Sequence, residues 1–592
     1  MSINTPAGQS DAGTQTADDS SSGFSRTFYV ANLMEIFERL AWYGFFAVSS
    51  VYMTTPSAQG GVGFTDLERG AVQGIIPFFL YLLPVLTGAL GDQLGYRKMF
   101  LLSFSIMAPG YFLLGQAQSF WPFFAALSLV ALGAACFKPV VVGTISHSTN
   151  DSNRGLGFGI FYTMVNIGGF LGPLLAGAFR AISWDAVFMM SACWILLNFI
   201  PVLWFYRDPP SLKRQSASLH DVFRQAQSVL GNGRFALTLL VAVVLLMCSG
   251  IELLSYVEAF SLIGLWLVIN LIWDRIAQRV TQAKAGWWAQ PMKISNVRFA
   301  VYLAILSGFW TVYNQLFYTL PLFIRDYVDT RDLLNFIAYF GEDAVAFFAY
   351  VDSAQLQSAV QVLHTQLQTG TVPAAEALRQ EWVHLKVNVP ASELTTLMAD
   401  LTASETLSSV QLQQITHSLL EYRQINPEYL INLDFAAIVL LQILVSYMCQ
   451  RIKPFYVLTA GLVVMFGAFS LMTVELTSTN GALMVTVILL IALGEMLTSP
   501  KSQEYVASIA PPSQAALYMG YYFVSMALGF LFAGFLSGWS YATLVQQDGR
   551  PDLMWGLFGA LALVTAVALY LFNRFLIQTP FQRVSVEEQT AL

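Results

Sequence analysis

The chain has 592 residues, of which 56% are hydrophobic and only 11% are charged, and its mean hydropathy is +0.58. A soluble globular protein carries about 25% charged residues, because its surface must be solvated. The composition therefore excludes a water-exposed globule and indicates an integral membrane protein with no nucleic-acid partner. The net charge of -7 adds little, because a bilayer would divide these charges between two compartments.

Residues 1–26 are rich in Ser, Thr, Asp and Gly and contain no basic segment followed by an apolar core. A cleavable signal peptide needs both of those features. So polar a segment cannot bury a core of its own. We expect a disordered cytoplasmic tail, followed by a first apolar run that stays in the membrane as a helix.

Apolar runs of about twenty residues recur along the chain, and a helix of that length crosses roughly 30 Å of hydrocarbon. The predicted order is six helices, two extra helices and six more, in an all-α membrane protein. The expected helices lie near 27–52, 67–90, 98–116, 120–146, 155–179 and 184–206, then 234–251 and 256–274, then 296–324, 429–450, 454–475, 480–508, 515–541 and 552–574.

The basic residues predict the orientation of these helices, because Lys and Arg gather in cytoplasmic loops. Several alternate turns are basic, whereas the opposite turns at 116–120 and 477–480 carry no Lys or Arg. We therefore expect a bacterial inner-membrane protein with both termini, including the tail 575–592, on the cytoplasmic side. The turns assigned to the cytoplasm hold Arg97 and Lys98, then Arg207, Lys213 and Arg214, then Arg275, Arg279, Lys284 and Lys293, then Arg451 and Lys453.

The segment 325–428 interrupts the pattern of membrane helices. It is polar and contains amphipathic stretches, for example 352–367 and 373–385. A loop of this length is either a small domain or a disordered segment, and the helical periodicity favours a domain. By the same orientation it lies outside the cytoplasm.

The first helix carries ionisable residues within its apolar run. Glu35, Glu38, Arg39 and Tyr43 follow one another at i, i+3, i+4 and i+8, which places them on one helical face. A charged group facing lipid costs about 2.5–3.5 kcal/mol on the gentler scales. We therefore expect this face to point into the bundle, where intramembrane charge usually marks a functional site. A buried ion-pair cluster that only fixes helix packing is the alternative.

This ExxER run, followed by an aromatic residue, Tyr43 and Gly44, resembles the helix 1 signature of the proton-dependent oligopeptide transporter (POT) family, within the major facilitator superfamily. Other motifs similar to that family follow in its order, and the resemblance covers the chain except 1–26 and 325–428. These motifs are 88–98 (GALGDQLGYRK), 137–139 (FKP), 158–174 on helix 5, Phe309 and Trp310 on helix 7, 494–500 (GEMLTSP) on helix 10, and 508–520.

The resemblance implies a major facilitator fold with two six-helix bundles. Residues 27–206 would form the N-terminal bundle, and 296–324 with 429–574 would form helix 7 and helices 8–12 of the second bundle. The stretch 207–295 would be a cytoplasmic linker with two extra transmembrane helices, a feature of the family's bacterial members. The segment 325–428 would be an added extracytoplasmic helical insert.

The resemblance also implies roles for the charged residues in proton coupling. Glu35, Glu38 and Arg39 would bind and relay the proton. Lys138 would pair electrostatically with that cluster and is a candidate for the peptide's terminal carboxylate. The loop that holds Asp92 and Arg97 governs conformational exchange in the superfamily.

The resemblance assigns the substrate site to residues of both halves. Glu495 would face the peptide's terminal amine, and a zwitterion with variable side chains is best recognised by its two termini. That recognition needs opposite charges held apart in a cavity, and Lys138 and Glu495 lie in different halves of the chain. The residues that would line the pocket are Tyr43, Asn166, Trp310 and Asn432.

Two positions depart from the family's pattern. Phe46 stands where the family often has a basic residue, and Asn314 stands where helix 7 usually carries an acid. In familiar members these two groups form an ion pair that helps close the outer gate, and losing both leaves no buried charge without its partner. Asp434 on helix 8 either compensates for the missing acid or is a solvated carboxylate near the helix end.

The sequence therefore predicts a proton-coupled symporter of di- and tripeptides in the plasma membrane, working as a monomer without a cofactor. It contains no metal-ligand spacing, no phosphate-binding loop and no nucleophile–base constellation, so we expect no enzyme and no metal. The alternatives are a relative that carries another small solute, such as an amino-acid conjugate or nitrate, and a transporter-like nutrient receptor. The intact ExxER run argues against nitrate, because nitrate carriers of the family tend to lose it.

Overall fold

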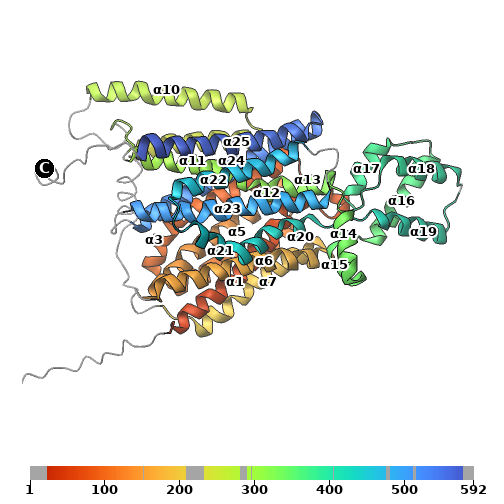
Figure 1. The fold of residues 1–592 in the computed structure, drawn as a ribbon, viewed down its shortest axis with the longest axis horizontal. Helices are drawn as coiled ribbons and strands as arrows, with labels where there is room; N and C mark the ends of the chain where they lie inside the picture. The colour runs from red at the N-terminus through yellow and green to blue at the C-terminus, as the bar shows by residue number, and fades with distance from the viewer. Residues whose placement is uncertain are drawn as a thin grey trace, which may run out of the picture.

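The chain is helical throughout the part that the computed structural model describes, and no β-strand occurs there. Long helices lie side by side in one bundle, and shorter helices project from one end of it (Figure 1). The predicted all-α fold is confirmed. The described residues are 23–150, 153–208, 232–280, 290–294, 296–404, 406–474, 480–510 and 515–577.

The first half of the bundle bends in its second helix. Pro84 begins α3 directly after α2, and the pair is bent by 41°, because proline lacks the N–H that would continue the α2 hydrogen bonds. The helices of this half are α1 (Arg26–Thr54), α2 (Asp66–Leu82), α3 (Pro84–Leu94), α4 (Tyr96–Gln116), α5 (Phe120–His147), α6 (Arg154–Arg180) and α7 (Trp184–Leu197), and the short turns are η1 (Ser57–Gln59) and η2 (Pro201–Phe205).

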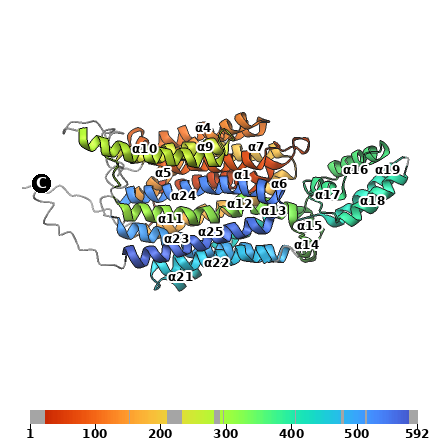
Figure 2. The same ribbon diagram turned by 90° about the horizontal axis from the view of Figure 1, so that it is seen from above.

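The two extra helices lie at the edge of the bundle. They are α9 (Gly233–Gly250) and α10 (Tyr256–Val280), and α10 runs along the outside of the bundle in Figure 1 and overlies it in the view from above (Figure 2). Most of the α10 side chains are exposed and apolar, among them Phe260, Leu265 and Leu271. Such a helix suits contact with lipid.

The second half of the bundle contains two discontinuous helices. The seventh helix is broken at Asn314 and at Thr319, and the eighth is broken at Asn432. The helices of this half are α11 (Val297–Tyr313), α12 (Gln315–Tyr318), α13 (Leu320–Tyr327), α20 (Pro427–Ile431), α21 (Leu433–Cys449), α22 (Pro454–Val474), α23 (Gly481–Ile509), α24 (Ala515–Ser540) and α25 (Pro551–Phe572), with short turns η8 (Tyr541–Gln547) and η9 (Asn573–Ile577).

Eleven helices of the described chain are long and apolar enough to span a membrane, and the bent pair α2–α3 makes a twelfth. The two other predicted spans are α1, which carries Glu35, Glu38 and Arg39 within its apolar run, and the run α11–α13. The expected helices therefore all have a counterpart in the structure.

Within the insert, Leu334 and Val345 belong to the core of the bundle, whereas the distal helices, residues 353–419, fold around a hydrophobic core of their own. Leu356, Val360 and Trp382 are buried in that core. Asn426 donates its N–H to the carbonyl of Phe348 at 3.0 Å, so the two ends of the distal helices lie together. The insert helices are α14 (Arg331–Ile337), η4 (Ala338–Phe340), α15 (Glu342–Phe348), α16 (Ser353–Gln368), α17 (Ala375–Val383), α18 (Ala391–Ala403), α19 (Ser409–Leu419) and η5 (Leu420–Tyr422).

Glycine brings the two halves into backbone contact near the insert. A Cβ added at Gly534 of α24 would lie 2.3 Å from the backbone nitrogen of Gly74 on α2, and one at Gly70 would lie 2.5 Å from the Gly534 carbonyl. Only glycine allows so close an approach. The contact fixes the two halves against each other at the end that carries the insert.

Several predictions concern residues outside the described parts. They include most of the tail 1–26, much of the linker 207–295 with Lys213, Arg214 and Lys284, and most of the tail 575–592.

Candidate functional site

The charged residues of α1 turn into the bundle, as predicted. Glu35, Glu38 and Arg39 are 4%, 0% and 2% exposed. Arg39 joins the two carboxylates: its Nε lies 3.3 Å from Glu35 Oε1 and donates to Glu38 Oε2 at 2.5 Å. Its guanidinium also lies 5.5 Å from the centre of the Tyr43 ring. One cation thus balances two acids, and each acid keeps one buried oxygen without a hydrogen-bond partner.

Lys138 of α5 brings a second cation toward this cluster. Its Nζ lies 4.9 Å from the centre of the Tyr81 ring on α2, a cation–π contact. Among the described residues Lys138 forms no direct ion pair, although it is close enough to Glu35 for the two opposite charges to attract each other. The expected electrostatic pairing is therefore at longer range, and Lys138 keeps its three donors available for another group.

The second half of the bundle buries two carboxylates, Glu495 on α23 and Asp434 on α21. Glu495 is 6% exposed and Asp434 is 0% exposed. Tyr313 donates its hydroxyl to Asp434 Oδ2 at 2.9 Å. The interpretation of Asp434 as a solvated carboxylate is wrong, because the eighth helix begins earlier, at Pro427, and the Asp434 side chain is fully buried within the span.

The polar residues expected to line the pocket are buried, and they face different partners. Asn432 donates to the carbonyl of Phe170 on α6 at 2.9 Å, which joins the two halves. Asn166 donates to the carbonyl of Tyr162 on its own helix at 2.8 Å. Trp310 is 5% exposed, and its indole N–H has no partner.

Unpartnered polar atoms gather in the second half around the helix breaks. They are Trp310 Nε1, Asn432 Oδ1, Asp434 Oδ1 and Glu495 Oε2. Buried polar groups are nearly always satisfied, so this group of atoms is suited to a ligand or to water.

The two positions that depart from the family's pattern are both buried and uncharged. Phe46 stacks on Trp42 and contacts Phe317 of α12, with ring centres 5.6 and 5.2 Å apart. Asn314 is 1% exposed, and its side chain donates to the carbonyl of Trp310 at 2.7 Å across the first helix break. Phe46 therefore packs among aromatic rings, while Asn314 satisfies its amide on its own helix.

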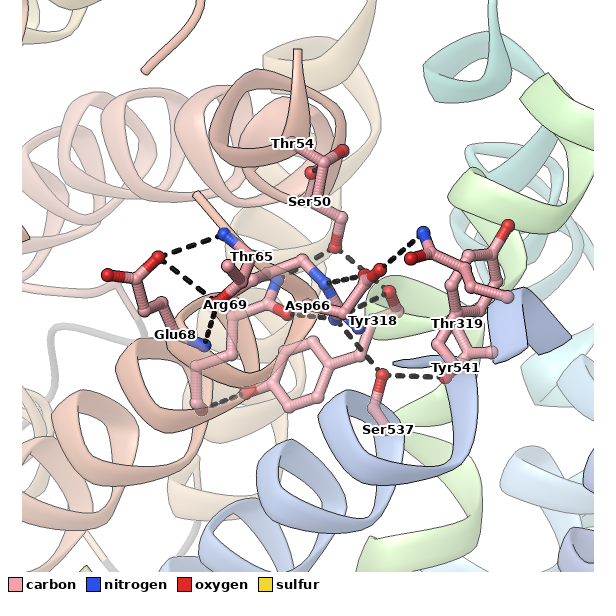
Figure 3. Close-up of polar contacts among 12 residues, drawn as sticks. Ser50, Thr54, Thr65, Asp66, Glu68, Arg69, Tyr318, Thr319, Ser537 and Tyr541 are labelled. Carbon is pink, nitrogen blue, oxygen red and sulfur yellow. Dashed lines mark hydrogen bonds and ion pairs between the residues drawn. The ribbon is translucent and has the colours of Figure 1, made fainter. Parts of the chain in front are cut away.

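A buried arginine that the sequence analysis missed links the halves near the insert. Arg69 of α2 lies 3.1 Å from Asp66 and donates to the Gln73 side chain at 2.8 Å. Across the interface it donates to the carbonyl of Tyr318 at 3.1 Å and to Ser537 at 3.0 Å (Figure 3). The signal in the sequence is the spacing of Asp66, Arg69 and Gln73, which places three polar groups on one face of an apolar helix.

Further bonds between the halves lie at the same end. Ser50 of α1 donates to the carbonyl of Phe317 at 2.9 Å, and Arg325 donates to Thr54 at 2.8 Å. Arg180 of α6 donates twice to Glu428 of α20, at 3.0 and 2.8 Å. These contacts join the two halves at the end of the bundle that carries the insert.

Asp92 and Arg97 lie at the end of the bundle far from the insert. Tyr96 donates to Asp92 at 3.1 Å. Arg97 donates to the carbonyls of Val202 and Leu203 at 3.2 and 2.7 Å, which ties α4 to the end of the sixth helix. The structure does not bring these residues to the buried charges, which suits a role in conformational exchange rather than in binding.

No group of three His, Cys, Asp or Glu side chains in the described ranges is arranged to hold a metal ion.

Comparison with known proteins identifies relatives of this architecture. The Major Facilitator Superfamily model matches residues 37–349 and 388–591. An uncharacterised transporter of Bacillus subtilis, YclF, is 24% identical over 301 residues, which cover 50% of this chain and 58% of that protein. The peptide transporter YePEPT of Yersinia enterocolitica is 27% identical over 315 residues, which cover 50% of this chain and 59% of that protein. The matched region spans less than two thirds of either relative.

Solved structures share the fold over nearly the whole chain. A POT family transporter in complex with a thioalcohol-conjugated peptide superposes with a TM-score of 0.61 at 15% identity, covering 93% of this chain and 97% of that one. An auto-inhibited POT family peptide transporter gives a TM-score of 0.60 at 16% identity, covering 95% and 99%. The expected fold, with helices added to the two six-helix bundles, is thereby confirmed.

Proposed function

Because the chain belongs to the Major Facilitator Superfamily, we propose that it is a symporter that imports di- and tripeptides together with protons by alternating access. One observation carries the proposal: a half-buried cation and a buried acid lie on opposite halves of one bundle. Lys138 beside the α1 cluster supplies a cation, and Glu495 on α23 supplies an acid that no protein cation pairs within the described chain. The names of relatives such as YePEPT support the choice of peptides.

The arrangement suits a zwitterion better than a singly charged solute. Lys138 meets the terminal carboxylate and Glu495 meets the terminal amine, while the Trp310 and Asn432 atoms without partners contact the peptide amides. Charge-assisted hydrogen bonds of this kind contribute about 1.5–3 kcal/mol each. Side chains of the peptide need no specific partner, so the site reads the backbone and tolerates variety.

The α1 cluster supplies the coupling to protons. Glu35 and Glu38 share one guanidinium, so the cluster carries one acid more than its own cation balances. Protonation of one carboxylate neutralises that excess, and release of the proton restores it. At 100 mV each proton contributes about 2.3 kcal/mol, which supports roughly fiftyfold accumulation of a neutral peptide before any pH gradient is added.

Alternating access follows from where the halves are joined. The buried contacts of Arg69, Arg180 and Arg325 close the bundle at the insert. With the insert outside the cytoplasm, this arrangement is closed to the outside, and transport requires these contacts to break and reform. The protein would work as a monomer in the plasma membrane, with both termini in the cytoplasm.

A second candidate substrate is a small zwitterion other than a plain peptide. One solved relative, with a TM-score of 0.60, is a POT family transporter in complex with 5-aminolevulinic acid. Such a solute presents the same two charges to Lys138 and Glu495.

Uptake into proteoliposomes tests the proposal. The purified protein should accumulate labelled di- and tripeptides when an inward proton gradient is imposed, and should only equilibrate them without it. If the protein accumulates 5-aminolevulinic acid but no peptide, that zwitterion would replace peptides as the proposed substrate. Equal accumulation with and without the proton gradient would refute the coupling.

A further inference from the structure

Asp434 is a buried carboxylate for which the proposed function gives no role. It is the second residue of α21, directly after the break at Asn432, and its side chain is fully buried. Tyr313 of α11 donates to one of its oxygens at 2.9 Å. The other oxygen, Oδ1, is buried without any hydrogen-bond partner.

The groups around Asp434 offer no compensating positive charge. The charged residue that acts on it is another acid, Glu495 of α23. The Tyr313 hydroxyl faces Asp434 from α11. The residue after Asp434, Phe435, packs against Tyr43 of α1 with ring centres 4.8 Å apart. Among the described residues no Lys or Arg forms an ion pair with either Asp434 or Glu495.

Two carboxylates in this setting cannot both be ionised in the absence of a cation. Taking an ion out of water costs several kcal/mol, and a second like charge nearby adds to that cost. At least one of the two must hold a proton when no substrate is bound. Glu495 must be ionised to meet the ammonium group of a substrate, which leaves the proton with Asp434.

From this geometry we infer that Asp434 is a second proton-carrying side chain of the transport cycle, placed in the half opposite the α1 cluster. The inference rests on the proposed function. The proton sits on Oδ1, the oxygen without a partner, so that the acid is neutral while the site is closed. On release the O–H bond breaks, the proton passes to water, and the Tyr313 hydroxyl stabilises the carboxylate that remains; reprotonation from water closes the cycle.

The first test is the number of protons moved with each peptide by the full-length protein in proteoliposomes. At a fixed peptide gradient, the membrane potential at which net flux reverses gives this ratio, since each charge moved contributes about 2.3 kcal/mol per 100 mV. Asp434→Asn should lower the ratio by about one proton, whereas Asp434→Glu should restore it. Asp343→Asn, which changes an exposed acid of the insert, should leave the ratio unchanged. An unaltered ratio in Asp434→Asn overturns the inference and leaves peptide transport by the wild type standing.

The second test does not depend on transport, and it covers a chain that moves no peptide. At neutral pH the infrared spectrum of the wild type should contain the C=O stretch of a protonated carboxyl group. Asp434→Asn should remove that band, so it should stand out in the difference between the two spectra. Tyr313→Phe removes one hydrogen bond from the same carboxyl group and should move that band to higher frequency. The Tyr313 variant decides the matter should Asp434→Asn not fold. A spectrum that neither substitution changes overturns the inference.

Discussion

The two halves of the bundle bury their acids in different electrostatic settings. In the first half, Arg39 bridges Glu35 and Glu38 from the same helix, and Lys138 adds a second cation nearby. In the second half, Asp434 accepts a hydrogen bond from Tyr313 and Glu495 one from Ser499, and each acid keeps one buried oxygen without a partner. In the first cluster the protein's own cations nearly balance the negative charge. In the second, the positive charge must come from outside the protein, either as a proton or as the ammonium group of a substrate.

This difference separates two tasks that a coupled transporter must perform. A cluster with internal partners keeps its geometry while a proton enters and leaves, so it suits a relay. A site that lacks its counter-charge gains most when a ligand supplies it, because an unpaired buried ion is strongly destabilising, by about 3–5 kcal/mol. The comparison therefore predicts different consequences for neutralising an acid in each half.

The largest expected effect follows from neutralising the relay. Glu38→Gln keeps the shape of the side chain and removes its titratable group, so concentrative uptake should be lost. Uptake of labelled dipeptide under an imposed proton gradient measures this, with Glu342→Gln on the exposed surface of the insert as the matched control. Accumulation by Glu38→Gln above the external peptide concentration would show that the relay lies elsewhere.

The next effect concerns the contacts that hold the halves together. Arg69→Met leaves Asp66 buried without its ion-pair partner, which costs about 3–5 kcal/mol and favours opening at the insert. Spin labels at Ala58 and Gln547, one on each half, should report a larger population of long distances. Arg331→Met removes a surface ion pair with Asp329 and should change little, because such pairs contribute about 0–1 kcal/mol. Identical distance distributions in Arg69→Met and the wild type would contradict the role of Arg69.

Lys386, a half-buried cation of the insert, tests the same electrostatic rule with the opposite sign. Burial, together with repulsion by Arg180, lowers the pKa of Lys386 to about 7, against the attraction of Glu428 and Asp352. Between about pH 7 and 10 the unfolded chain then binds more protons than the folded one, so the stability of the insert should rise with pH.

Protease resistance of the insert at neutral and alkaline pH measures this dependence on Lys386. The wild type should be better protected at about pH 9 than at about pH 7, and Lys386→Met should lose that difference. Lys453→Met, at an exposed position far from the insert, should behave as the wild type does. Equal protection of the wild type at both pH values would show that Lys386 does not make the stability of the insert depend on pH.

The smallest effect is expected from removing the distal part of the insert. Helices α16–α19 pack around their own core, and the hydrogen bond between Phe348 and Asn426 holds the two cut ends together. A short linker in place of 350–424 should therefore leave membrane insertion and dipeptide uptake close to the wild type. Loss of uptake by a correctly inserted deletion variant would assign the insert to the transport cycle.

The sequence predicted the fold and the first charged cluster because both follow from local spacing. The apolar runs marked the helices, and the i, i+3, i+4 pattern placed Glu35, Glu38 and Arg39 on one face. The burial of Asp434 left no comparable signal, because its partner Tyr313 lies on another helix more than a hundred residues away. Arg69 was missed for a related reason: its partners Tyr318 and Ser537 lie hundreds of residues away.

The central claim is that the acid of the second half waits for a cation from the substrate, and binding of peptides with free or acetylated amino termini tests it most directly. The wild type should prefer the free amine by roughly tenfold to a hundredfold, since a charge-assisted hydrogen bond contributes about 1.5–3 kcal/mol. Glu495→Ala should lose most of that preference, while Glu504→Ala, an exposed acid on the same helix α23, should keep it. Full discrimination by Glu495→Ala would contradict the account.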